Sequence, residues 1–147
     1  MRIDTYQPDD LPHVIALWQA ANLTRPWNDP ATDIAFCMRS PDATLLLGRD
    51  DATGKIIGSA MTGHDGHRGW VYYVAVAPDR QGEGLGAQLM AAAEAWLTAR
   101  DVPKLHLMVR DSNAQAIGFY ERLGYKVEPV KVLSKWLRPP PAKPTTA

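Results

Sequence analysis

One stretch of the chain constrains its fold more than any other: an apolar run that stops at a proline and is followed by three glycines and a helix. Residues 70–76 are rich in Val and Tyr, which is typical of a buried strand, and Pro78 ends that strand. Glycines follow at positions 82, 84 and 86, and apolar residues then recur at helical spacing to about residue 100. The pattern predicts a strand, a glycine loop and a helix in direct succession.

The glycine loop is a candidate anion site, because glycines let backbone N–H groups crowd around a phosphate and the next helix adds its positive N-terminus. Gly82, Gly84 and Ala87 fit the dinucleotide pattern G-x-G-x-x-A. A Rossmann site is nevertheless disfavoured, since residues 78–81 separate the strand from the first glycine and the preceding strands form a meander. A P-loop fails because no Gly-Lys-Ser/Thr follows. The plain alternative is a helix start that uses glycine only for close packing.

The rest of the chain alternates short strands with short helices. In chain order we expect a strand at 2–5, a helix from about 11 to 22, a helix beginning at Pro30, strands at 44–48, 55–62 and 70–76, a helix from 84 to about 100, a strand at 105–109, a helix at 113–123, and short terminal strands around 125–127 and 131–137. The three consecutive strands should be antiparallel. The proline-rich tail 139–147 is expected to be disordered, which leaves one domain over residues 1–138.

Charge and cysteine content exclude several classes of protein. Sixteen Lys and Arg residues balance sixteen Asp and Glu residues, so the basic footprint of a non-specific nucleic-acid binder is absent. The single Cys37 cannot form an intramolecular disulfide or a cysteine zinc site. The sequence has no signal-peptide pattern and no apolar run of the roughly 20 residues that a membrane span needs. We therefore expect a soluble cytoplasmic protein.

Three motifs resemble, in order, those of the GNAT superfamily of acetyl-CoA-dependent N-acetyltransferases. Residues 81–86 are similar to its Q/R-x-x-G-x-G/A motif. Residues 74–78 resemble the end of its central strand, and residues 113–125 resemble its N-x-x-A-x-x-F-Y-x-x-x-G-F/Y segment. The resemblance covers residues 1 to about 137. Residues 23–30 and 65–69 further resemble the YpeA-type subgroup, whose acceptor is not established.

The resemblance implies an α/β fold of the α+β type. Its sheet would be mixed and mostly antiparallel, with about six to seven strands and about four flanking helices. A splay between the fourth and fifth strands would open a wedge for the co-substrate.

The resemblance also implies acetyl-CoA as co-substrate and no metal. Main-chain groups of Val74, Ala75 and Val76 would meet the pantetheine arm, and an N–H near Val74 or Val76 would stabilise an oxyanion. Backbone amides would hold the pyrophosphate, from Gln81, Gly82, Glu83, Gly84, Leu85, Gly86 and Ala87.

Two residues of the 113–125 motif carry expected roles. Asn113 and Tyr120 lie two helical turns apart, so their side chains share one face. The resemblance implies that Tyr120 protonates the departing thiolate and that Asn113 holds the co-substrate. A phenol with a pKa near 10 suits that thiolate. The alternative is that Tyr120 is only a core aromatic residue.

The general base and the acceptor site are less defined. The strand at 70–76 contains no glutamate, so the remaining candidate bases, acting through water, are Tyr72, Tyr73, His64, His67 and Asp65. By analogy with the family, the acceptor site should include the connector before the second helix. Since one domain leaves no separate acceptor domain, the turn before residue 70, the terminal strands and a partner subunit are the other places that could select the amine. The candidate residues of the acceptor site are Arg25, Trp27, Asn28, His67, Arg68 and Tyr72. Alternatively, the connector residues only stiffen their loop and cover the core, and Asp65 only forms a tight turn.

The leading prediction is an enzyme that moves acetyl to a primary amine of a small molecule or peptide. The sequence leaves open whether the protein forms a homodimer. The alternative is a non-catalytic acyl-CoA-binding module; Tyr120 favours the enzyme, whereas the lack of a definite base favours the module. His64 and His67 with Asp65 lack a third nitrogen or sulfur ligand, which disfavours a metal site. Nucleic-acid binding is disfavoured because no basic stripe accompanies the aromatic residues of the strand at 70–76.

Overall fold

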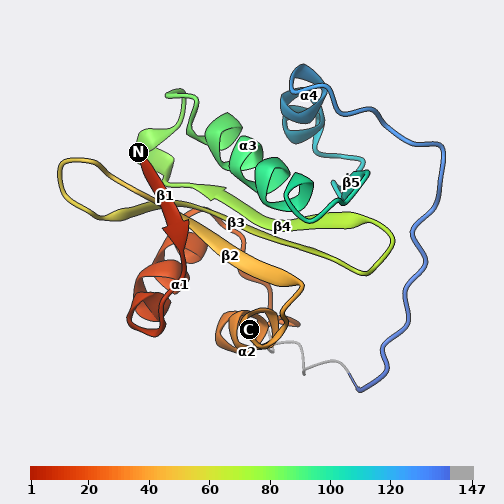
Figure 1. Ribbon diagram of the computed structural model, residues 1–147, viewed down its shortest axis with the longest axis horizontal. Helices are drawn as coiled ribbons and strands as arrows, with labels where there is room; N and C mark the ends of the chain where they lie inside the picture. The colour runs from red at the N-terminus through yellow and green to blue at the C-terminus, as the bar shows by residue number, and fades with distance from the viewer. Residues whose placement is uncertain (140–147) are drawn as a thin grey trace, which may run out of the picture.

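The computed structural model describes residues 1–139 of the chain (Figure 1). The elements are β1 (Arg2–Thr5), a 3₁₀ turn η1 (Pro8–Asp10), α1 (Leu11–Ala20), α2 (Pro30–Arg39), β2 (Ala43–Arg49), β3 (Ile56–His64), β4 (Gly69–Val76), a 3₁₀ turn η2 (Pro78–Arg80), α3 (Leu85–Thr98), β5 (Leu105–Leu107) and α4 (Ala114–Arg122). The predicted order is confirmed through α4.

The five strands lie in the order β1-β2-β3-β4-β5. The first four are antiparallel to their neighbours, which confirms the predicted meander, and β5 is parallel to β4. The β4–β5 pairing joins only Gly69 to Leu105, Trp70 to His106 and Val71 to Leu107. From Tyr72 onward β4 has no β5 partner, so the strands part where the splay was predicted.

Helices cover both faces of the sheet (Figure 1). On one face α1 and α2 bury Trp18 and Ile34 against strand residues such as Leu45. On the other face α3 contributes Met90 and Ala93 to a cluster that contains Val71 of β4. Asp29 caps α2 by accepting a hydrogen bond from the backbone N–H of Thr32, and Pro30 occupies the first turn, as the Asp-Pro pair predicts. The two faces together hold β4 in the middle of the molecule.

The predicted terminal strands are wrong. In the described chain no strand follows β5, so the sheet has five strands instead of six to seven, and β5 ends at Leu107 instead of Val109. The segment 126–139 is exposed and runs along the outside of the molecule (Figure 1). Strand-like composition is not enough, because a strand needs a paired neighbour to satisfy its backbone.

The tail that was expected to be disordered is residues 139–147, of which 140–147 lie outside the described residues, and the domain boundary at 138 stays a prediction. Within residues 1–139, no helix combines the length and apolarity that crossing a membrane requires.

Candidate functional site

The strand that carries the site, β4, contains a bulge. Met61 and Ser59 of β3 pair with Tyr72 and Ala75, so the single residue Ala60 opposes both Tyr73 and Val74. Tyr73 has a φ of +52°, a left-handed conformation that side-chain-bearing residues rarely adopt. Such backbone persists only where surrounding contacts hold it.

Side chains from α1, α2 and β3 supply those contacts. The Tyr73 ring stacks on Trp18 with centroids 3.8 Å apart, and its hydroxyl donates to Asp33 Oδ2 at 2.5 Å. Ser59 Oγ donates to the Tyr73 carbonyl at 2.7 Å and accepts from Trp18 Nε1 at 2.9 Å. Burial, and then the bond to the Asp33 carboxylate, raise the pKa of Tyr73, so its proton stays on the phenol. Tyr73 is therefore a clamp for the bulge and a poor general base.

The bulged strand presents main-chain groups toward the gap beside β5. Ala77 N–H donates to Ile57 O of β3 at 2.8 Å, so by alternation the N–H and C=O of Val76 point to the opposite edge. By the same alternation the N–H and C=O of Val74, two residues earlier in β4, would point to that edge too, although Val74 belongs to the bulge. Because β5 pairs no further than Val71, this edge can bind an extended ligand with amide groups.

The glycine loop stands at the end of the same strand. Gly82 and Gly84 have φ values of +82° and +76°, and a Cβ built on either meets no atom within 4 Å. Gly84 is also the N-cap of α3, where backbone N–H groups are available to an anion. Gly86 differs, since its Cβ would lie 3.1 Å from Cζ of Phe119 on α4. Gly86 thus serves packing, whereas Gly82 and Gly84 shape an open surface that suits a phosphate.

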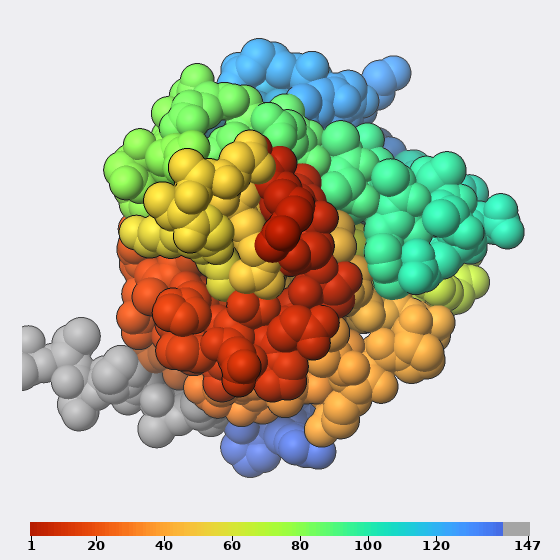
Figure 2. All heavy atoms as spheres, turned by 60° about the vertical axis from the view of Figure 1, so that its left-hand side comes forward, coloured from red at the N-terminus to blue at the C-terminus, as the bar shows by residue number. Residues whose placement is uncertain are grey.

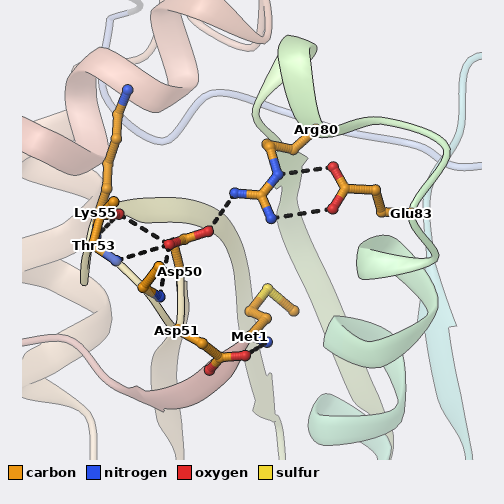
Figure 3. Close-up of polar contacts among 8 residues, drawn as sticks. Met1, Asp50, Asp51, Thr53, Lys55, Arg80 and Glu83 are labelled. Carbon is orange, nitrogen blue, oxygen red and sulfur yellow. Dashed lines mark hydrogen bonds and ion pairs between the residues drawn. The ribbon is translucent and has the colours of Figure 1, made fainter.

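An ion-pair network braces this loop (Figure 3). Arg80 donates to Asp50 Oδ2 at 2.5 Å, and to Glu83 Oε2 at 2.8 Å and Oε1 at 3.1 Å. Asp50 belongs to the β2–β3 hairpin, whose turn it caps through the N–H groups of Ala52 and Thr53. The Arg80 guanidinium holds the pKa values of both carboxyls below their usual range. The carboxylate of Glu83 is thereby partly neutralised within a loop that would bind an anion.

Tyr120 lies next to this surface on α4. It packs in the apolar cluster that includes Val74 and Phe119, and Phe119 in turn contacts the start of α3 near Gly86. Burial raises the pKa of Tyr120, so the phenol carries its proton at neutral pH and can act as a donor. Asn113 is the N-cap of α4, and its Oδ1 accepts from Ala116 N–H at 3.1 Å. Asn113 of the 113–125 motif therefore stabilises the first turn of α4.

The predicted acceptor residues fall into two separate groups. In the connector, Arg25 Nη1 donates to the carbonyls of Asn22 and Thr24 at 2.8 and 2.9 Å, beside the half-buried Trp27 and the exposed Asn28. This geometry matches the stiffening alternative. His67 and Arg68 occupy the turn before β4, at the opposite end of that strand from Val76. Tyr72 is exposed between the two ends of β4.

The turn before β4 is held by Asp65. Its Oδ1 accepts from the N–H groups of His67 and Arg68 at 2.9 and 2.8 Å, and these bonds lower its pKa to about 2. A carboxylate with that pKa is a weak proton acceptor. His64 Nδ1 accepts from Gly66 N–H at 3.1 Å, so it too belongs to the turn. Among residues 1–139, His, Cys, Asp and Glu side chains nowhere gather in threes as a metal site would need.

Sequence reasoning missed the residues that support the site. Trp18 and Ser59 hold the bulge from α1 and β3, Asp33 holds it from α2, and Asp50 braces the glycine loop from a hairpin. Each acts across at least fourteen positions of sequence, so no local spacing signals it. The one available signal was the uncommon tyrosine pair at 72 and 73 within an apolar strand.

Comparison with known proteins gives consistent results. A family model described as the acetyltransferase (GNAT) family matches residues 13–125. An acetyltransferase from Pectobacterium atrosepticum is 44% identical over 138 residues, which cover 93% of this chain and 96% of the relative.

Solved structures share the fold. The ribosomal-protein-S18-alanine N-acetyltransferase from Escherichia coli is 29% identical with a TM-score of 0.71, covering 84% of this chain and 76% of that one. A structure of AAC(6')-Iy in complex with the bisubstrate analog CoA-S-monomethyl-acetylneamine is 18% identical with a TM-score of 0.77, covering 93% of this chain and 97% of that one.

Proposed function

We infer that this chain, which belongs to the acetyltransferase (GNAT) family, transfers the acetyl group of acetyl-CoA to a primary amine. One arrangement carries the inference: the open glycine loop, the unpaired edge of β4 and the half-buried Tyr120 lie around the same end of the sheet. The loop suits the pyrophosphate, and the strand edge suits the amides of the pantetheine arm. A chain with no net charge can bind this polyanion because backbone N–H groups and the N-terminus of α3 would hold the phosphates.

The proposed reaction is a direct attack. The nitrogen of a neutral amine forms a bond to the thioester carbonyl carbon, and the carbon–sulfur bond then breaks. Tyr120 gives its phenolic proton to the leaving thiolate and becomes a phenolate. The proton that the amine nitrogen loses is relayed through water to this phenolate, which restores the phenol. A main-chain N–H of Val74 or Val76 would stabilise the charge that develops on the carbonyl oxygen. The Tyr73 clamp supports this step by fixing the bulge from which that N–H projects.

The acceptor is proposed only as a class. One structural relative is named for acetylating the alanine of a ribosomal protein, and another was solved with an acetylneamine analog. The acceptors that these names indicate differ in size. A panel of test acceptors should therefore include peptide N-termini and aminoglycosides as well as small amines and lysine. Membership of the YpeA-type subgroup, with Arg25, Trp27, Asn28, His67, Arg68 and Tyr72 as acceptor contacts, stays part of this proposal.

A thiol-release assay over that panel, together with calorimetric CoA binding, tests the function. Tyr120→Phe should lower kcat by about 100-fold or more while CoA affinity stays within a few-fold, since a general acid contributes about that much. Tyr6→Phe, a tyrosine that packs in the other core cluster, is the matched control and should keep full activity. CoA binding without turnover of any amine would favour the binding module, and no CoA binding would overturn the inference.

The pH profile tests the role of Tyr120 separately. Because burial raises its pKa above the ordinary value of about 10, kcat should not fall until the pH exceeds 10. The rate that remains in Tyr120→Phe should lack this alkaline fall. An unchanged profile in the variant would show that another group donates the proton.

A further inference from the structure

The ion-pair network beside the glycine loop joins two segments that lie next to each other on the surface. Figure 2 shows the tip of the β2–β3 hairpin, in yellow, against the green segment that contains the glycine loop. Arg80 bridges them, because its Nη1 donates to Asp50 of the hairpin while its Nε and Nη2 donate to the two carboxylate oxygens of Glu83 (Figure 3). One guanidinium is thus shared between two carboxylates.

The two carboxylates are held unequally. Asp50 also accepts hydrogen bonds from the backbone N–H groups of Ala52 and Thr53 at 2.9 and 2.8 Å, and its side chain is 16% exposed. Within residues 1–139 the carboxylate of Glu83 has no hydrogen-bond partner besides Arg80, and its side chain is 44% exposed. An exposed ion pair contributes little to stability. Glu83 is therefore the partner that Arg80 can release at little cost.

The edge of the guanidinium that Arg80 presents to Glu83 is also the edge that fits a phosphate. Its Nε–H and Nη2–H groups are parallel, and such a pair matches two oxygens of a phosphate as it matches the two oxygens of a carboxylate. Glu83 lies between Gly82 and Gly84, whose positive φ values and open Cβ positions shape the proposed pyrophosphate surface. A phosphate on that surface would therefore compete with Glu83 for Arg80.

We propose that the Nε–Nη2 edge of Arg80 passes from Glu83 to a phosphate of CoA when CoA binds. The inference rests on the proposed use of acetyl-CoA. Asp50 keeps its bond to Nη1 throughout, and the N–H of Arg80 stays bonded to Ala77 O at 2.9 Å, so the exchange moves side chains and leaves the backbone in place. The released carboxylate of Glu83 turns to solvent. Arg80 thereby selects acyl donors that carry a phosphate.

Calorimetric titration with CoA separates this exchange from a fixed ion pair. In a Glu83→Gln background, adding Arg80→Ala should weaken CoA binding by about 10-fold or more, because a bidentate bond between charged groups is lost. The loss should remain when Asp50→Asn is also added, since that change removes the repulsion from an unpaired Asp50. If Arg80 only neutralises the two acids, the triple variant should bind CoA within about 2-fold of Glu83→Gln, which would overturn the inference.

Lys55→Ala in the same background is the matched control. It removes one positive charge from the same hairpin, and the exposed Lys55 side chain extends away from the ion pairs (Figure 3). CoA affinity should change by less than about 2-fold. A loss as large as that of Arg80→Ala would show a general charge effect and contradict the exchange. Far-UV circular dichroism and thermal unfolding check that each variant is folded.

Dephospho-CoA, which lacks the 3′-phosphate, shows which phosphate Arg80 binds. An equal effect of Arg80→Ala on the binding of CoA and of dephospho-CoA would support the exchange and assign Arg80 to the pyrophosphate. An effect on CoA alone would support it and assign Arg80 to the 3′-phosphate. A parent that binds no CoA would overturn the proposed function together with this inference. A parent that binds CoA and acetylates an amine, but whose Glu83→Gln form keeps its CoA affinity without Arg80, would overturn this inference alone.

Discussion

The two sides of β4 differ in how completely the rest of the chain packs against them. Toward β3, α1 and α2, the polar groups of Trp18, Ser59 and Tyr73 bond to one another inside a packed core. Toward β5 and α4, the strand pairing stops after three residues, a cavity opens, and the segment that follows is exposed. The first side, which we call the clamp side, is complete within one chain. The second, which we call the open side, has an edge of β4 without a strand partner beyond Val71.

This difference separates the two tasks of the proposed site. The clamp side holds a strained strand in one geometry, whereas the open side leaves room for binding. Substitutions of the same chemical type on the two sides should therefore have unequal effects. Such pairs give direct tests of the comparison.

The largest expected difference is between two tryptophans. Trp18 is fully buried and Trp136 is 57% exposed. Trp18→Ala should lower the free energy of unfolding by about 3–5 kcal/mol, because it removes a large core side chain and leaves Ser59 without its donor. Trp136→Ala should change the free energy of unfolding by less than about 0.5 kcal/mol. Urea unfolding at low concentration measures both, and equal losses would contradict the comparison.

A smaller difference is expected between two ion pairs. Arg49 binds both oxygens of the buried Asp10 at 3.1 and 2.9 Å, whereas Lys104 and Glu128 pair at 2.9 Å in solvent. The hydrogen bonds from Arg49 lower the pKa of Asp10, so this stability is present above the unfolded pKa of about 3.9 and is lost as the pH falls through the lower folded value.

Asp10→Asn should therefore cost about 1–2 kcal/mol at pH 7, a difference that shrinks below about pH 4. Glu128→Gln should cost nothing measurable, since an exposed pair is screened by solvent. Urea unfolding from pH 3 to 7 provides the measurement. A pH-independent loss in Asp10→Asn would show that its ionisation is not responsible.

Two tyrosines that bond to carboxylates give the next test. Tyr73 donates to Asp33 at 2.5 Å on the clamp side, and Tyr125 donates to Glu94 at 2.6 Å at the surface of the open side. Tyr73→Phe should cost about 1–2 kcal/mol of stability and lower kcat several-fold without changing CoA affinity, because the bulge loosens. Tyr125→Phe should cost less than about 0.5 kcal/mol. A kcat unchanged in folded Tyr73→Phe would mean that the clamp is only structural.

The smallest effect concerns the two acids on Arg80. Glu83 lies in the glycine loop, and Asp50 lies in the hairpin that braces it. Glu83→Gln should tighten CoA binding by about 2- to 5-fold, because it removes a negative charge beside the pyrophosphate. Asp50→Asn should weaken binding, because the hairpin no longer holds Arg80 in place. Calorimetric titrations at two salt concentrations would measure both, and a tightening that persists at high salt would exclude an electrostatic cause.

Much of the fold was predictable because its signals are local. Proline at position 78, the glycines and the apolar periodicities are read within a few residues, and they placed every strand and helix through α4. The prediction of the terminal strands was wrong because it too used only local signals. Residues 125–127 and 131–137 have strand-like composition, but pairing depends on a neighbour that composition does not specify.

The candidate site divides in the same way. The proposed roles of the loop and of Tyr120 came from motifs, and the structure adds that Gly82 and Gly84 face open space while Gly86 packs against Phe119. Nothing in the sequence singled out Asp33 or Ser59, and nothing announced that Tyr73 adopts a positive φ. Those facts arise where α1, α2 and β3 converge on β4.

By itself, then, the sequence determined the order of the elements, the position of the glycine loop after β4 and the helix that carries Tyr120. These depend on interactions between residues close together in the chain. Only the tertiary structure decided how the bulge is held, that Asp50 pairs with Arg80, and that within residues 1–139 β5 pairs with β4 alone. They depend largely on contacts between segments that are far apart in the chain and that only folding brings together, such as Arg80 with Asp50, 30 positions away, and Tyr73 with Asp33, 40 positions away.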